Sequence, residues 1–346
     1  MPNIPAPPSH PPRIRIGGPE EIVAAMPHLL GFHPAESVVA IGLRGRRARV
    51  CLALRVDLPA AEHEPGLAAL VTDHLRRCGA TAVILLIVTE ATTPAGELPR
   101  PALVNELRAA LGRRGVAVRD VLCARGARWW SYVCEEPACC PPEGSPVRPD
   151  AAAVLATATV AEGRVVHADR EQLVATLAPT PVPDADARRR RFAATHARDR
   201  AALATEAGRG AVLAEIAEVV AARAERPAPL TDAQVVRFCV ALTELAVRDA
   251  CLRWLPGPLA DVAEGVWLEL VRAAAPPYAA APAALLALHG YARGDGTFAR
   301  IAADRAIEDE PGYAMAWLVH ESLDRGLPPT AIQELGACVE PAGGDA

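Results

Sequence analysis

Apolar positions in the first half of the chain recur with two different periods, which predicts helices and strands in alternation. A helix is expected from Pro19, a first-turn residue, to a C-cap at Gly31, with an interruption at Pro27. β-rich runs at residues 37–43 and 49–57 enclose a turn that contains glycine, so they predict a hairpin.

Residues 82–88 form an unbroken apolar run, which predicts a strand that is buried on both faces of a sheet. Further elements are expected as a helix at residues 62–78, a helix at 101–113 and strands at 116–125 and 128–134. The predicted order is a helix, two strands, a helix, a strand, a helix and two strands. This order is typical of a mixed sheet covered by helices. The sequence therefore predicts an α/β domain over residues 18–178.

The second half of the chain shows helical periodicity and no strand-like alternation. Helices separated by Pro or Gly are expected at residues 187–224, 231–254, 258–274, 282–293, 296–308 and 313–325. Residues 179–186 contain three prolines and predict a linker, so an all-α domain is expected over residues 187–335. Residues 1–17 and 336–346 are expected to be a flexible leader and a flexible tail.

Residues 283–325 are similar to a tetratricopeptide-like helix pair, with small Ala residues at repeated packing positions and Gly294 between the helices. One such unit must pack on the preceding helices, because it cannot bury its apolar face alone. This pattern suggests a protein or peptide partner on the helical domain. A plain helical bundle is the alternative.

Composition excludes several kinds of chemistry. All 36 basic residues are Arg, and a chain without Lys can form neither a Schiff base nor a P-loop phosphate site. Serine-hydrolase, dinucleotide and zincin motifs are missing from the sequence. The run at 82–88 is far too short to cross a bilayer, and the N-terminus has no apolar signal region, so we expect a cytoplasmic protein without a membrane span.

The strongest basic run is Arg188–Arg191. We interpret it as a solvated helix face that is paired with Asp184, Asp186 and Asp199, because runs of charge are usually exposed and no aromatic residue is interleaved for base stacking. With a net charge of -5, a nucleic-acid partner is disfavoured.

Three of the nine cysteines cluster, with the spacing C-x4-C-C at Cys134, Cys139 and Cys140. Thiolates bind soft metals, and zinc is the cofactor that this cluster suggests, with Cys123 or His33 as a fourth ligand. The alternatives are plain packing in a turn and redox or nucleophilic thiol chemistry. We expect Cys134 to approach one member of the adjacent pair while the other turns into the core, since neighbouring side chains diverge in extended backbone.

His33, Glu36 and Ser37 stand between a helix end and a strand, where loops often carry sites, and are the candidate catalytic residues. A structural interpretation competes with this one. His33 near a helix C-terminus is favourable for the helix dipole, and Ser37 can begin a strand.

Several unusual sequence motifs occur in order along the chain: HLLGFHPAESVVAIGL at residues 28–43, RWWSYVC followed by CCPPEG at 128–144, and GDGTFARIAADRAIEDEPGYAMAWL at 294–318. In these motifs the chain resembles an uncharacterised actinobacterial family that is known only as a domain of unknown function, over roughly residues 13–330. The resemblance implies an actinobacterial, intracellular protein. It carries no established activity and no catalytic residue.

The sequence thus leaves two functional hypotheses. The leading one is a non-catalytic cytoplasmic adaptor or protein-interaction protein, because the pattern of paired helices is a clearer signal than any set of catalytic residues in the sequence. The alternative is a metal- or thiol-dependent enzyme centred on Cys134, Cys139 and Cys140 with His33.

Overall fold

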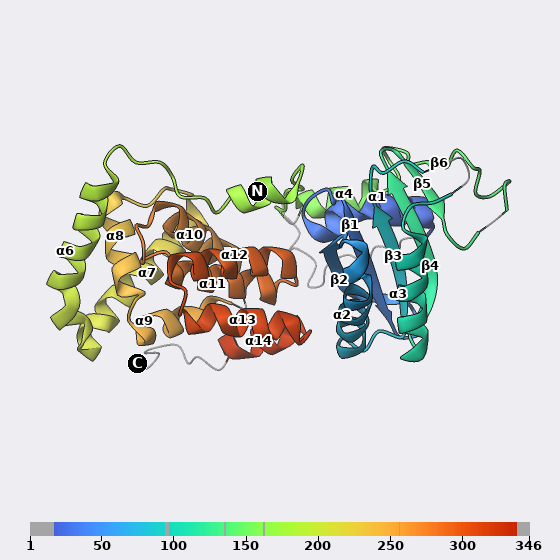
Figure 1. Cartoon of the computed structure of the whole chain (residues 1–346). Coiled ribbons are helices and arrows are strands. Elements are labelled where there is room, and N and C mark those ends of the chain that lie inside the picture. Colours follow the sequence, from blue (N-terminus) through green and yellow to red (C-terminus); the bar gives the residue numbers. More distant parts are fainter. Residues whose placement is uncertain (1–16, 94–96, 135, 162, 256, 338–346) are drawn as a thin grey trace, which may run out of the picture. The chain divides into compact units, whose positions relative to one another are not determined.

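The computed structural model describes residues 17–93, 97–134, 136–161, 163–255 and 257–337 (Figure 1). The chain divides into two compact units, one up to Gln172 and one from Leu173. The linker expected at residues 179–186 follows the helix α5 (Arg170–Ala175), and its last two residues already belong to the helix α6 (Ala185–Leu203). The expected leader and tail lie outside the described residues, apart from residue 17 and residues 336–337.

The first unit contains the alternation of strands and helices that the hydrophobic pattern predicts. Its elements are α1 (Pro19–Leu30), β1 (Ser37–Arg44), β2 (Arg49–Asp57), η1 (Ala61–His63), α2 (Glu64–Arg77), β3 (Ala82–Val88), α3 (Pro101–Arg113), β4 (Ala117–Arg125), β5 (Arg128–Ser131), β6 (Ser145–Pro146) and α4 (Ala153–Ala161). The helix α5 (Arg170–Ala175) spans the division between the units.

The strands form one six-stranded sheet in the order β2-β1-β3-β4-β5-β6. Only β3 and β4 pair in parallel, and the other neighbours are antiparallel, so the sheet is mixed as predicted. The helices α2 and α3 cover one face, and α1 lies on the other in Figure 1. The central strand β3 is buried on both faces because its side chains point alternately to the two helix layers.

Local signals fix the ends of several elements. Pro19 opens α1, and Gly31 closes it with a left-handed backbone (φ 81°) and an N–H that donates to the carbonyl of Pro27. The strand predicted at 128–134 is three residues too long. It ends at Ser131 because the Ser131 hydroxyl accepts from the backbone N–H groups of Val133 and Cys134, which turns the chain away from the sheet.

The described part of the second unit consists of helices, as the periodicity predicts, but the segments expected as single helices at residues 187–224 and 231–254 are each divided. Its helices are α6 (Ala185–Leu203), α7 (Glu206–Glu225), α8 (Asp232–Ala241), α9 (Leu245–Ala250), η2 (Cys251–Trp254), α10 (Ala260–Ala273), α11 (Ala280–Ala292), α12 (Gly296–Asp309), α13 (Ala314–Asp324) and α14 (Pro329–Ala337). The helix α11 is buried along its whole length. It pairs with α12 after a turn at Gly294 (φ 86°), which is the helix pair expected in this region.

The basic run on α6 forms the expected ion pairs and two that were not expected. Arg189 pairs with Asp186 and Arg190 with Asp184, and the expected Asp199 pairs with Arg198 further along α6. Arg188 and Arg191 both pair with Asp232, at the start of α8. Asp232 was not expected as a partner, because this pairing depends on how α6 and α8 pack.

His289 is a buried neutral imidazole in α11 whose Nε2 accepts from the indole N–H of Trp267 on α10 at 3.1 Å. Burial lowers its pKa to about 3. In the unfolded chain the His289 imidazole takes up a proton near pH 6.5, whereas in the folded chain it does so only near pH 3. The unfolded state therefore binds more protons in that window, and the free energy of unfolding falls as the pH falls through it.

We expect His289→Gln, which keeps an acceptor for Trp267, to remove this contribution. The loss of unfolding free energy between pH 7 and pH 4.5, measured by urea denaturation, should be smaller in the variant by about 2 kcal/mol. His63→Gln is the control, since the His63 side chain is 73% exposed. An identical pH dependence in wild type and His289→Gln would contradict this assignment.

Candidate metal centre

The loop that carries the cysteines is fastened to β5 by side chains of that strand. Arg128 donates from Nε to the carbonyl of Glu143 at 2.8 Å and from Nη2 to that of Gly144 at 2.9 Å. The indole N–H of Trp130 donates to the carbonyl of Pro142 at 3.0 Å. These bonds fold the loop back over β5, so Cys139 and Cys140 lie close to Cys134.

Gly144 is required by this folding back. Its backbone is left-handed (φ 79°), and a Cβ here would lie 2.3 Å from Cε2 of Trp130. Real Cβ atoms do not approach other atoms so closely. The glycine therefore supplies both the turn and the space in which the indole lies against the loop.

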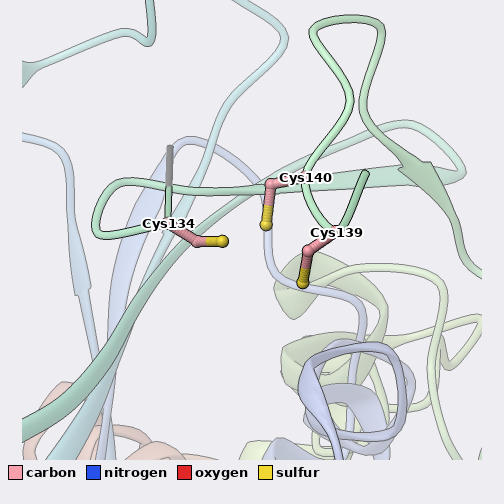
Figure 2. Close-up of side chains that lie close together, drawn as sticks. All are labelled: Cys134, Cys139 and Cys140. Atoms are coloured by element: carbon pink, nitrogen blue, oxygen red, sulfur yellow. The ribbon is translucent and has the colours of Figure 1, made fainter. Parts of the chain in front are cut away.

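The three cysteines converge, as Figure 2 shows, with the Cys134 sulfur directed toward Cys140. Their Sγ atoms all lie within 4.8 Å of one another. Tetrahedral zinc with bonds of about 2.3 Å holds its sulfurs about 3.8 Å apart. Closure by about 1 Å, through rotation of exposed or half-buried side chains, would bring the three thiolates to that geometry.

The expectation that one member of the adjacent pair turns into the core is wrong. Cys139 is exposed and Cys140 is half-buried. The backbone N–H groups of both residues donate to the same carbonyl, that of Glu136, at 3.0 and 2.7 Å. A tight turn therefore replaces the extended backbone on which that expectation rested, and neighbouring side chains no longer point to opposite sides.

The thiols of the cluster differ in acidity. A hydrogen bond from the Cys140 side chain, together with one from the backbone of Glu136, lowers the pKa of Cys134. Burial raises the pKa of Cys140 to about 12, and its hydrogen bonds to Cys134 and Cys139 add to this effect. The Cys134 and Cys140 thiols thus differ in acidity, and a bound cation would favour the thiolate form of Cys140.

A pocket of about 540 Å³ lies beside the cluster. The cluster residues Cys134 and Cys140 line it, together with Thr93, Glu97, Leu98, Pro99, Pro101, Cys123, Arg125, Trp130, Ser131, Tyr132, Pro137, Pro141 and Pro142. Part of this lining follows β3, begins α3 or ends β4, and the rest belongs to β5 and the loop after it. The pocket is therefore at the carboxyl end of the parallel strand pair. Open α/β sheets bind their ligands at this edge.

The pocket wall is held in place by its own contacts. The guanidinium of Arg125 lies over the Trp130 ring, 4.7 Å from its centroid, and Nη1 donates to the carbonyl of Ala91 at 3.1 Å. The Tyr132 hydroxyl donates to the carbonyl of Pro99. Trp130, Tyr132 and Cys134 alternate along the chain, and all three line the pocket.

Neither residue predicted as a fourth ligand joins the cluster of sulfurs. Cys123 lines the same pocket, but it is 1% exposed and burial raises the pKa of its thiol to about 11. His33 is exposed, and its backbone N–H donates to the carbonyl of His167. Within the described part of the chain, three cysteines alone form the group.

The other candidate catalytic residues hold the start of β1. The Glu36 carboxylate accepts from the Thr89 hydroxyl at 3.0 and 2.8 Å and from the Glu90 backbone N–H at 2.8 Å. Ser37 is fully buried. Glu36 thus fastens the chain that leaves β3 toward the pocket, and a catalytic role for His33, Glu36 and Ser37 stays a prediction.

In a comparison with known families, residues 19–330 match the family described as Domain of unknown function (DUF4192). The chain belongs to this family. The match confirms the resemblance to a family of unknown function that the sequence motifs indicated. Searches of curated proteins and of solved structures found no match.

Several residues of this DUF4192 site were not singled out from its sequence. Arg125 and Gly144 belong to it through their contacts with Trp130. The sequence did offer one indication of this site, because the motifs RWWSYVC and CCPPEG are close together and both contain residues of it. Separately, no helix in the described part of this DUF4192 chain has the length and apolar character needed to span a membrane.

Proposed function

We propose that the first unit of this DUF4192 protein is a zinc-dependent enzyme domain, in which Cys134, Cys139 and Cys140 bind one Zn²⁺ and the pocket beside them takes a small-molecule substrate. The observation that carries this proposal is the convergence of three sulfurs within 4.8 Å at the wall of a pocket. It adopts the alternative that the sequence left open, without His33 as a ligand.

The number of ligands favours a catalytic rather than a purely structural site. Structural zinc is usually closed by four protein ligands, whereas catalytic zinc has three and keeps one position for water or substrate. The cluster offers three described thiols, two of which line the pocket. The remaining position would be open to a molecule in that pocket, where the metal polarises an oxygen or sulfur bound to it.

The thiols also make metal binding dependent on pH. Because Cys140 has a raised pKa of about 12, zinc must displace its proton, and apparent zinc affinity should rise with pH. Free thiols suit a reducing compartment, which supports the cytoplasmic location expected from the sequence.

Elemental analysis of full-length protein purified without chelators tests the proposal. We expect about one zinc per chain, and Co²⁺ in its place should give the absorption of a tetrahedral thiolate site. Cys134→Ser, Cys139→Ser and Cys140→Ser should each lower zinc affinity by at least about 10-fold. Zinc titration with a competing chelator measures the change.

Cys123→Ser is the matched control, since Cys123 lines the same pocket but stands outside the cluster. It should keep its zinc. A wild-type protein that carries no zinc, and takes up neither Zn²⁺ nor Co²⁺ at micromolar concentration, would refute the proposal.

A second function is favoured by a different observation, on the second unit. Trp317 and Leu318 on α13 are 52% and 66% exposed, and the Trp317 indole is held by a hydrogen bond to the carbonyl of Pro311. An anchored, exposed aromatic side chain is typical of binding surfaces. We therefore keep the hypothesis of a protein partner that covers this part of α13.

Quantitative co-purification of the wild type against Trp317→Ala tests this second function. A partner should be recovered with the wild type and lost from the variant, while Val154→Ala, at an exposed apolar position on α4 of the first unit, should retain it. Equal recovery with all three proteins would contradict a role for α13.

A further inference from the structure

A second pair of cysteines, apart from the candidate zinc site, is placed for a reaction of its own. Cys51 lies on β2, and Cys78 is the C-cap residue of α2, 27 residues later. Their Sγ atoms are 3.1 Å apart. We infer that Cys51 and Cys78 form a redox pair, which small peroxides oxidise to a disulfide and thiol reductants restore.

The hydrogen bonds assign different roles to the two sulfurs. The Cys78 thiol donates its proton to the carbonyl of Leu75 at 3.2 Å. Because a thiol has one proton, the contact between the sulfurs is then a bond from Cys51 to Cys78. The bond from Cys51 is directed at the Cys78 sulfur, so we assign Cys78 as the sulfur that attacks the oxidant and Cys51 as the one that resolves it. Burial and this bond raise the pKa of Cys51 to about 12.

The chemistry balances with a peroxide as the only oxidant. The Cys78 thiolate attacks hydrogen peroxide, which breaks the O–O bond and gives a sulfenic acid on Cys78 and hydroxide. The Cys51 sulfur then attacks the sulfenic sulfur and expels its oxygen, which leaves as water with the Cys51 proton. The hydroxide takes the proton that Cys78 released. In sum, two thiols and one peroxide give one disulfide and two waters.

The surroundings permit the bond to form. A disulfide needs its sulfurs at about 2.05 Å, so they must approach by about 1 Å. Both cysteines are half-buried, which leaves access for a small oxidant. Gly42 on β1 leaves the space between strand and helix in which they meet, since a Cβ there would lie 2.8 Å from Leu75 Cδ2 and 3.4 Å from Cys51 Sγ.

The disulfide would tie an edge strand to the helix that covers it. β2 is the first strand of the sheet and has one neighbour, β1. Cys51 and Cys78 both pack on the hydrophobic core beneath α2. Cross-linking restricts the unfolded chain over this loop, so oxidation should raise the unfolding temperature of the first unit by about 5 °C, reversibly.

Tryptic mapping of the full-length protein after treatment with one equivalent of hydrogen peroxide tests the inference. The arginines place Cys51 in the peptide 50–55 and Cys78 in the peptide 78–108, whose internal Arg100 precedes Pro101 and resists trypsin. All three zinc-site cysteines fall together in the peptide 129–164. We expect a linked species of 50–55 with 78–108 that disappears on reduction.

Two results would overturn the inference. One is oxidation of the peptide 129–164 while 50–55 and 78–108 stay unlinked. The other is a link that forms at equal yield from Cys78 to any other cysteine peptide. Because the mapping uses the wild-type chain, it does not depend on whether a variant folds.

Variants separate the two sites. Cys51→Ser should trap Cys78 as a sulfenic acid, which dimedone labels, and should abolish the reversible shift in unfolding temperature. Cys123→Ser, at a buried cysteine on β4 of the same sheet, should leave the link intact. Zinc content should be the same in Cys51→Ser as in wild type, so a failure here and a failure of the zinc proposal remain distinguishable.

Discussion

Gly144→Ala is expected to lower the zinc affinity of the cysteine cluster by about 10- to 100-fold, although Gly144 offers no ligand. The new Cβ would lie 2.3 Å from Cε2 and 2.6 Å from Cζ2 of the Trp130 indole, which is a rigid group. The indole also donates to the Pro142 carbonyl and lies beneath the Arg125 guanidinium, so it has little freedom to move. The loop would have to separate from β5, and the three sulfurs would no longer converge.

Gly126→Ala is the matched control for this prediction. Gly126 also has a left-handed backbone (φ 53°), in the turn between β4 and β5, but a Cβ there meets no atom within 4 Å. Both variants carry the strain of a positive φ, and only Gly144→Ala adds the clash. Competition titration of zinc should show near-wild-type affinity for Gly126→Ala. Equal losses in the two variants would mean that backbone strain, and not the contact with Trp130, governs the loop.

The elements of this protein were predictable where the signal is local. The unbroken apolar run at 82–88 became β3 with the same bounds, and the helix expected at 101–113 became α3 with the same bounds, opened by Pro101. Gly31 took the left-handed conformation of a C-cap. In each case residues that are neighbours in the sequence determine the conformation, so the local sequence is enough to predict the element.

The convergence of the cysteines was not predictable in the same way. Spacing alone gave a weak match to zinc, because C-x4-C-C in extended backbone sends adjacent sulfurs apart. The observed turn depends on Arg128 and Trp130 reaching residues 142–144, and these contacts form only once β5 is in the sheet. The same holds for Asp232 as the partner of Arg188 and Arg191, since helix packing brings it there. Local pattern identifies such groups, and tertiary contacts decide what they do.

The connection between α6 and α7 provides the largest expected effect on stability. Gly208 is at the third position of α7, and a Cβ there would lie 2.0 Å from the carbonyl oxygen of Ala202 on α6. That oxygen accepts from both the backbone N–H and the hydroxyl of Thr205, the N-cap residue of α7. It cannot retreat without breaking the cap. Gly208→Ala should therefore lower the free energy of unfolding by about 3 kcal/mol, measured by urea denaturation followed by helical circular dichroism.

Gly210→Ala, two residues further along α7, makes the same chemical change where a Cβ meets no atom within 4 Å. There the replacement should stabilise the protein by about 0.5 to 1 kcal/mol, because alanine loses less backbone entropy than glycine in a helix. The two variants must therefore move stability in opposite directions. A Gly208→Ala protein as stable as Gly210→Ala would show that helix propensity dominates here and that the turn between α6 and α7 yields to a methyl group.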